Sequence, residues 1–187
     1  MFATLVGLTL AAVLAARGPV GDAVLEITLP LRHEDIIRQQ AHDKGIDPAL
    51  IAAVIYQESK FEDRTSDAGA RGVMQILPST AHYIARKSGG TAFEQGDLAD
   101  PQINIAYGSW YLRYLLEHYK GNERLAIAAY NGGESNVDRW VTKAGGPDEF
   151  KTDKDIPFSE TRAYVASVEQ KQAAYRDKYA GELGIRR

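Results

Sequence analysis

The chain has 187 residues, of which 25% are charged and 44% are hydrophobic, and its formal net charge is −3. This length and balance predict one globular domain with its own core and exclude a disordered chain. The lack of a long basic run argues against electrostatic binding to a nucleic acid, and the lack of cysteine excludes disulfides, thiolate metal sites and catalytic thiols.

The N-terminal segment departs from this globular pattern. Residues 2–16 form an almost uninterrupted apolar run that ends at Arg17-Gly18-Pro19. About 15 apolar residues suit a signal peptide better than a membrane span, which needs about 20. No Lys or Arg precedes the run and no clear cleavage site follows it, so a signal peptide and a short uncleaved anchor both stay open for residues 1–17. We favour these over a buried helix and expect an extracytoplasmic domain, with membrane association through residues 2–16 if the segment is retained.

Helix signals dominate the rest of the chain, and there is no strand pattern and no internal repeat. We expect a linker or extended arm at 18–32, a helical domain at 33–180 and a polar tail at 181–187. Capping residues and apolar periodicity predict helices at about 34–44, 48–60, 78–88, 101–119, 125–133, around 137–141 and at 159–179, the last capped by Ser159. The fold class is therefore mainly α.

Two local features lead to specific expectations. The helix predicted at 101–119 carries an aromatic stripe, and this spacing is typical of core packing, so we assign Trp110 and Tyr111 to the core and not to sugar stacking. Asn131 and Gly132 are predicted to adopt a left-handed cap that turns the side chains of Tyr130 and Asn131 away from the helix axis.

Glu58 is the titratable residue that the helix pattern singles out. Asp47 and Pro48 suit the N-cap and first position of its helix, and the carboxylate falls on the same face as Ile51 and Ile55, near the C-terminal end. Burial and the negative end of the helix dipole both disfavour the charged form and raise the pKa of Glu58. A raised pKa prepares a carboxylic acid to donate a proton near neutral pH. Without further motifs, a salt bridge at the helix end would be the commoner role.

Metal and acyl-transfer chemistry find no support in the sequence. There is no Ser, His and Asp pattern for acyl transfer, and the four histidines, which lie far apart, match no metal-ligand spacing: His33, His42, His82 and His118. We therefore expect no metal and no cofactor.

Four short motifs follow one another along the chain. They are Gln57-Glu58-Ser59-x-Phe61, Gly72-Val73-Met74-Gln75-Ile76-x-Pro78, Ala129-Tyr130-Asn131-Gly132-Gly133 and Glu160-Thr161-Arg162-x-Tyr164-Val165. In this order they resemble the four motifs of the soluble-type lytic transglycosylases, which are lysozyme-like muramidases related to goose-type lysozyme. The resemblance covers about residues 34–180.

The resemblance implies a single lysozyme-like helical domain with a cleft for peptidoglycan strands, acting in cell-wall remodelling as a monomer. Family members cleave the β-1,4 bond between N-acetylmuramic acid and N-acetylglucosamine without water and leave a 1,6-anhydromuramyl end. Glu58 matches the sole catalytic carboxyl of the family. It would protonate the glycosidic oxygen as general acid and then, as general base, activate the C6 hydroxyl that closes onto C1.

The same resemblance implies roles for other residues. The positions that match the family's substrate cleft are Ser66, Gln75, Tyr130 and Glu160. Met74 matches the residue that packs beneath the cleft, whereas Asn131 and Arg162 match positions that support it. We expect Glu160 and Arg162 to form a structural ion pair or to partner a buried group, and Glu160 not to be a second acid.

Two alternatives remain at this point. A hydrolytic muramidase of goose-lysozyme type would need a second carboxylate to hold water, for which Asp67 is the candidate. A cell-wall binding protein without activity is the other, and the presence of Glu58 argues against it.

Overall fold

The computed structural model describes residues 28–89 and 93–186. The expected export segment at 1–17 and most of the expected arm at 18–32 lie outside these ranges. The chain divides into two compact units, Met1–Arg32 and His33–Arg187, and the second unit carries the helices discussed below. Among the described residues, none of the helices combines the length and apolar character that a membrane crossing requires.

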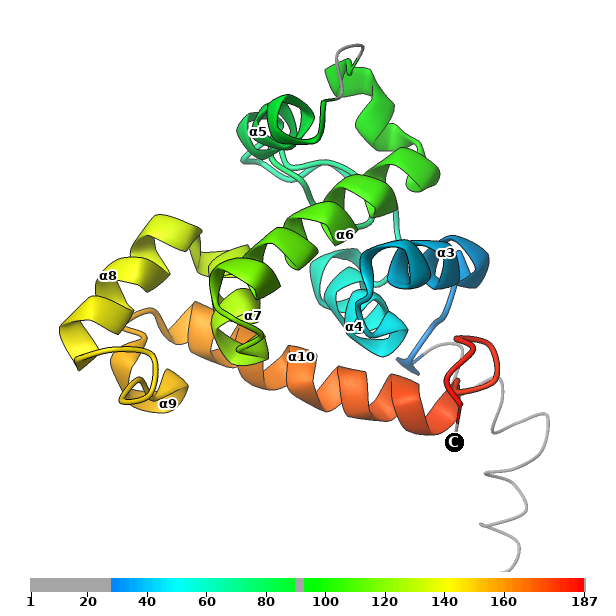
Figure 1. The fold of residues 1–187 in the computed structure, drawn as a ribbon. Coiled ribbons are helices and arrows are strands. Elements are labelled where there is room, and N and C mark those ends of the chain that lie inside the picture. The colour runs from blue at the N-terminus through cyan, green and yellow to red at the C-terminus, as the bar shows by residue number, and fades with distance from the viewer. Residues whose placement is uncertain (1–27, 90–92, 187) are drawn as a thin grey trace, which may run out of the picture. The chain divides into compact units, whose positions relative to one another are not determined.

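The second unit is built of helices, and its described part contains no strand, so the prediction of a mainly α fold is confirmed (Figure 1). Two isolated bridges, Thr65 to Arg71 and Arg71 to Ile76, shape the loop between the helix Pro48–Ser59 and the helix Pro78–Ser88. The helices are α3 (Glu34–Lys44), α4 (Pro48–Ser59), α5 (Pro78–Ser88), the 3-10 helix η1 (Gln95–Ala99), α6 (Pro101–His118), α7 (Glu123–Gly132), α8 (Glu134–Ala144), α9 (Thr152–Asp155) and α10 (Ser159–Lys178).

Local capping chemistry explains where several helices begin. Asp47 and Asp100 each precede a proline, and their carboxylates accept hydrogen bonds from the backbone N–H of Ala49 at 3.0 Å and of Gln102 at 2.7 Å. The expected cap at Ser159 is wrong. The N-cap of α10 is Phe158, whose backbone is extended, and Ser159 is already helical.

Helix α4 is buried on all sides, which corrects the expectation of a helix with one apolar face. Residues 49–55 are all buried. Helix α10 runs alongside α4, and α3 packs against it as well (Figure 1). Glu58 is therefore placed by its position in the last turn of an enclosed helix, and not by a single apolar stripe.

Helix α6 crosses the unit and contacts α3, α5, α7 and η1 (Figure 1). Its buried side is made by Asn104, Ile105, Gly108, Ser109, Leu112 and Leu115. Trp110 and Tyr111, expected in the core, are only partly buried. The aromatic rings lie beside the aliphatic face and contact one another, with Trp110 stacked on Tyr114 at 5.8 Å and Tyr83 of α5 edge-on to Tyr114 at 5.8 Å.

The residues after α10 also pack. Leu183 is buried, and Arg38 of α3 donates a hydrogen bond to the backbone carbonyl of Glu182. Residues 181–186, expected to be a polar tail, are thus attached to the helical unit.

Asn104 fixes the loop between α4 and α5 against α6. Its side-chain oxygen accepts from the backbone N–H of Met74 at 2.8 Å, and its amide nitrogen donates to the carbonyls of Arg71 at 2.9 Å and Leu98 at 3.0 Å. Gly72 makes this approach possible, because a Cβ there would lie 2.1 Å from the Asn104 amide nitrogen. A single buried amide thus satisfies three backbone groups from two segments.

Replacing Asn104 with Ala would leave those three buried backbone groups without their partner. We expect Asn104→Ala to lower the free energy of unfolding by about 3 kcal/mol, measured by urea denaturation. Gln102→Ala, at an exposed position of the same helix, is the control and should change it by less than about 0.5 kcal/mol. Equal effects of the two changes would contradict the role given to Asn104.

Candidate active site

Glu58 lies in the last turn of α4 and faces α10. Its carboxylate accepts a hydrogen bond from the phenol of Tyr164 at 2.6 Å, and Tyr164 is buried. Arg64, in the loop after α4, donates to the backbone carbonyl of Glu58. The acid is therefore partly buried, with a neutral donor on one side and a cation close by.

The electrostatic environment of Glu58 suits an acid. The pKa of Glu58 is raised overall from 4.5 to about 7, and the largest cause is burial, because the charged form loses hydration. The hydrogen bond from Tyr164 and the positive charge of Arg64 lower the pKa, since both favour the carboxylate. Burial prevails, and the predicted rise of the pKa is confirmed.

Tyr130, near the end of α7, lies close to this carboxyl. Its phenol donates to the backbone carbonyl of Met74 at 3.0 Å, and its ring is 5.7 Å from the ring of Tyr111. Burial, the charge of Glu58 and Tyr111 all raise the pKa of Tyr130 well above its ordinary value. Tyr130 therefore remains a neutral phenol at any physiological pH.

The turn that follows Tyr130 differs from the expectation by one to two residues. Asn131 and Gly132 are still helical, and Gly133 has the positive φ of 84°. Gly132 serves packing instead, because a Cβ there would lie 3.2 Å from Thr161 of α10. The small residue lets α7 approach α10 closely.

Ser66 and Gln75 bond to their own loop. The Ser66 hydroxyl accepts from the backbone N–H of Ala70 at 3.0 Å. The Gln75 amide nitrogen donates to the carbonyls of Arg64 at 2.9 Å and Gly72 at 2.8 Å, and its backbone has a φ of 48°. Both side chains therefore shape the loop between Glu58 and α5.

Met74 is buried beneath this loop. It lies against Gly108 of α6, where a Cβ would be 2.3 Å from the methionine sulfur. The contact of Gly108 with Met74 could not be predicted from the sequence, because a glycine inside a helix gives no turn or cap signal.

The remaining motif residues join α7 to the start of α10. Thr161 donates to the side-chain oxygen of Asn131 at 2.8 Å, and Arg162 donates to the backbone carbonyl of Ile156 at 2.5 Å. Glu160 is exposed in the first turn of α10. In the described part of the chain Glu160 and Arg162 do not form an ion pair, and of the two expected roles Arg162 takes the other, as the partner of the buried Ile156.

A surface hollow of about 320 Å³ adjoins Tyr130 through Tyr111. It is lined by Ser79, Thr80, Tyr83, Tyr111, Gly133, Glu134, Ser135 and Asn136. Its size is at the lower end of that of sites for small molecules. Tyr111, expected in the core, thus lines this surface hollow and also contacts the ring of Tyr130.

A helical domain that presents one partly buried carboxyl between aromatic side chains matches a known family. The transglycosylase SLT domain matches residues 35–152, and the chain belongs to this family. It is 36% identical over 155 residues to the soluble lytic murein transglycosylase of Escherichia coli K12. The matched region covers 81% of this chain and 24% of that protein. It is 30% identical over 168 residues to the membrane-bound lytic murein transglycosylase C of Edwardsiella ictaluri, covering 78% and 46%.

Solved structures agree with this assignment. The 70 kDa soluble lytic transglycosylase of Escherichia coli is 33% identical with a TM-score of 0.76 and covers 86% of this chain and 26% of that one. An inactive mutant of the lytic transglycosylase Slt from Pseudomonas aeruginosa is 32% identical with a TM-score of 0.74, covering 83% and 25%. The chain spans about a quarter of the length of the soluble Escherichia coli proteins and of the Pseudomonas aeruginosa protein.

The contact between Tyr164 and Glu58 yields a test of the site's electrostatics. Because the phenol favours the carboxylate, Tyr164→Phe should raise the pKa of Glu58 above its value of about 7. NMR titration of the glutamate side-chain carbons would measure the shift. Tyr107→Phe, on the partly exposed side of α6, is the control and should leave the Glu58 titration unchanged. An unchanged or lowered pKa in Tyr164→Phe would show that the hydrogen bond does not act on the carboxylate.

Proposed function

We propose that this chain carries the activity of a peptidoglycan lytic transglycosylase. It would cleave the β-1,4 bond between N-acetylmuramic acid and N-acetylglucosamine and leave a 1,6-anhydromuramyl end. The observation that carries the proposal is Glu58, a partly buried carboxyl with a pKa of about 7, in a domain of the transglycosylase SLT family.

Glu58 would first donate a proton to the substrate and then accept one from it. In its neutral form it donates a proton to the glycosidic oxygen as the bond to C1 of the muramic acid breaks. The resulting carboxylate then takes the proton of the C6 hydroxyl, whose oxygen forms the new bond to C1. The carboxyl regains its proton, so the cycle consumes no water. A pKa near the working pH suits both steps.

The use of one carboxyl agrees with its surroundings. Glycosidases that employ water or a protein nucleophile hold two carboxylates about 5 to 9.5 Å apart. In the described part of the chain, the side chains that shift the pKa of Glu58 are Tyr164 and Arg64, and neither carries a carboxyl group. Asp67, the candidate for a hydrolytic reaction, is exposed in the loop. The C6 hydroxyl is tethered to the reacting sugar and needs no second carboxylate to position it.

The neighbouring side chains receive supporting roles in this proposal. Tyr164 is a positioning residue that stabilises the carboxylate after the first proton transfer. Tyr130 would lie beside the positively charged sugar centre, and Met74 would form the floor under it. Ser66 and Gln75 would shape one wall of the cleft and offer it their remaining polar atoms. Glu160 would lie at the rim of the cleft, and Asn131, which accepts a hydrogen bond from Thr161, would brace α7 against α10.

We place the protein at the cell envelope, since peptidoglycan is the proposed substrate. The relatives include proteins named as soluble and as membrane-bound transglycosylases. The apolar run at 2–16 supports export through a signal peptide or anchor at residues 1–17.

Product analysis tests the reaction. Digestion of purified sacculi should release muropeptides with 1,6-anhydro ends, detected by mass spectrometry. Glu58→Gln should lower kcat/KM about 10³-fold, because the amide cannot give up a proton. Glu62→Gln, an exposed acid four residues on, is the control and should keep full activity.

Three other outcomes would overturn parts of the proposal. Reducing ends in place of anhydro ends would favour the hydrolytic muramidase. Binding to sacculi without any cleavage would favour the inactive wall-binding protein. Full activity of Glu58→Gln would remove Glu58 from the chemistry.

The pH dependence tests the state of the acid. Since Glu58 must be protonated to begin the reaction, kcat/KM should fall as the pH rises through about 7. Tyr164→Phe should move this fall to higher pH, because that change raises the pKa. A rate that continued to climb into the alkaline range would contradict the role of Glu58 as the general acid.

A further inference from the structure

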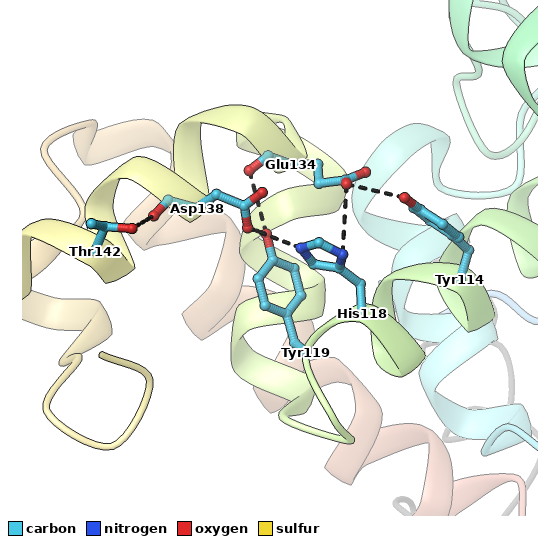
Figure 2. Close-up of polar contacts among 6 residues, drawn as sticks. All are labelled: Tyr114, His118, Tyr119, Glu134, Asp138 and Thr142. Atoms are coloured by element: carbon cyan, nitrogen blue, oxygen red, sulfur yellow. Dashed lines mark hydrogen bonds and ion pairs between the residues drawn. The ribbon is translucent and has the colours of Figure 1, made fainter. Parts of the chain in front are cut away.

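Three side chains with metal-binding atoms meet where the end of α6 faces the first turns of α8 (Figure 2). His118 is the last residue of α6, and Glu134 and Asp138 lie four residues apart on α8, so both point to the same side of that helix. The imidazole Nε2 is 3.0 Å from Asp138 Oδ1, and Nδ1 is 3.7 Å from Glu134 Oε1. One ligand atom from each residue lies within 4.8 Å of those of the other two.

We propose that His118, Glu134 and Asp138 form a binding site for a divalent transition-metal cation, with Zn²⁺ as the best match. A ring nitrogen with two carboxylates is a donor set that Zn²⁺ uses in proteins, whereas Ca²⁺ and Mg²⁺ prefer oxygen donors alone. Ligand atoms around a tetrahedral Zn²⁺ are about 3.3 Å apart. Side chains that are partly exposed can reach this spacing by small rotations, and solvent can supply a fourth ligand.

Further hydrogen bonds hold the two carboxylates in place. Tyr114 donates to Glu134 Oε1 at 3.0 Å, and Tyr119 donates to Asp138 Oδ1 at 3.0 Å (Figure 2). The Tyr119 hydroxyl is also 3.4 Å from the backbone carbonyl of Glu134. Metal-binding carboxylates in proteins are oriented by such outer partners. The phenols come from the same helix end as His118, so the cluster is supported from both elements.

The charges of the cluster favour a cation. Two carboxylates lie beside one imidazole, and within the described ranges neither Glu134 nor Asp138 forms an ion pair with Lys or Arg. With a neutral imidazole the three side chains carry a net negative charge that a divalent ion would offset. This site has no metal-ligand spacing in the sequence, because its histidine and its acids come from two different helices.

A bound cation would tie the start of α8 to the end of α6. Glu134 also lines the hollow beside Tyr111, directly after the Gly133 turn. The ion would therefore stabilise one wall of that hollow without taking part in proton transfer at Glu58. The proposal does not depend on the lytic activity.

Metal titration of the chelator-treated protein tests the site. Calorimetry with ZnCl₂ should show one ion bound per chain, and Co²⁺ in its place should give visible absorption bands of a nitrogen- and oxygen-ligated tetrahedral site. Each of the three side chains supplies a ligand atom, so His118→Gln and Asp138→Asn should each weaken Zn²⁺ binding at least tenfold. Changes to the residues that orient a metal ligand already weaken metal binding by that factor. His42→Gln is the matched control, because His42 is also exposed and paired with one carboxylate, Asp43.

The melting temperature gives a second readout. Zn²⁺ should raise it for the wild type and for His42→Gln, and not for the ligand variants. Glu134→Gln keeps the side-chain shape and serves if another variant fails to fold. A wild type that binds no Zn²⁺, or a His118→Gln variant that binds it as tightly as the wild type, would overturn the proposal. A lower melting temperature of His118→Gln without any metal effect would identify the cluster as a hydrogen-bonded network alone.

Discussion

The packing of α4 against α10 is the constraint on which the site depends, and polar contacts fix this pair along its length. At one end, Asp47 caps α4 and also accepts hydrogen bonds from Gln172 at 2.7 Å and Arg176 at 2.5 Å. At the other end, Glu58 accepts from Tyr164 at 2.6 Å. The two helices therefore run antiparallel, and the position of the acid is defined by both ends of one helix pair.

This placement has a cost in folding stability. A carboxyl with a pKa of 4.5 when unfolded and about 7 when folded binds its proton more tightly in the folded state. Stability is therefore unaffected below about pH 4.5, declines as the pH rises toward 7 and is lower by about 3 kcal/mol above it. Burial of the apolar residues 49–55 of the same helix stabilises the fold and offsets this loss.

Features set by neighbouring residues could be predicted from the sequence. The Asp-Pro pairs at 47–48 and 100–101 mark helix starts because capping is a local interaction. The raised pKa of Glu58 could also be predicted, since any burial of that helix end acts in the same direction. The helix pattern in the sequence places Glu58 on a single apolar face of its helix. That explanation is incomplete, because α4 is enclosed on all sides along residues 49–55.

Features that depend on contacts between distant segments could not be predicted. Asn104 looks like an ordinary polar residue until the loop that it holds is known. The rings of Trp110 and Tyr111 match a core pattern, yet the smaller side chains of α6 fill the core and leave the aromatic residues at its edge. Tyr164 belongs to a recognised motif, but its bond to Glu58 spans 106 positions of the chain and has no local signal.

The separation of Glu58 and Tyr164 in the chain affects when, during synthesis and folding, Glu58 reaches its final environment. Synthesis proceeds from the N-terminus, so α4 is made long before α10. Until α10 packs, Glu58 lacks both the enclosure that raises its pKa and the phenol that orients it, and it behaves as an ordinary surface glutamate. In a growing or still unfolded chain Glu58 therefore has the acidity of a free glutamate, and the raised pKa arises only when the last long helix is in place.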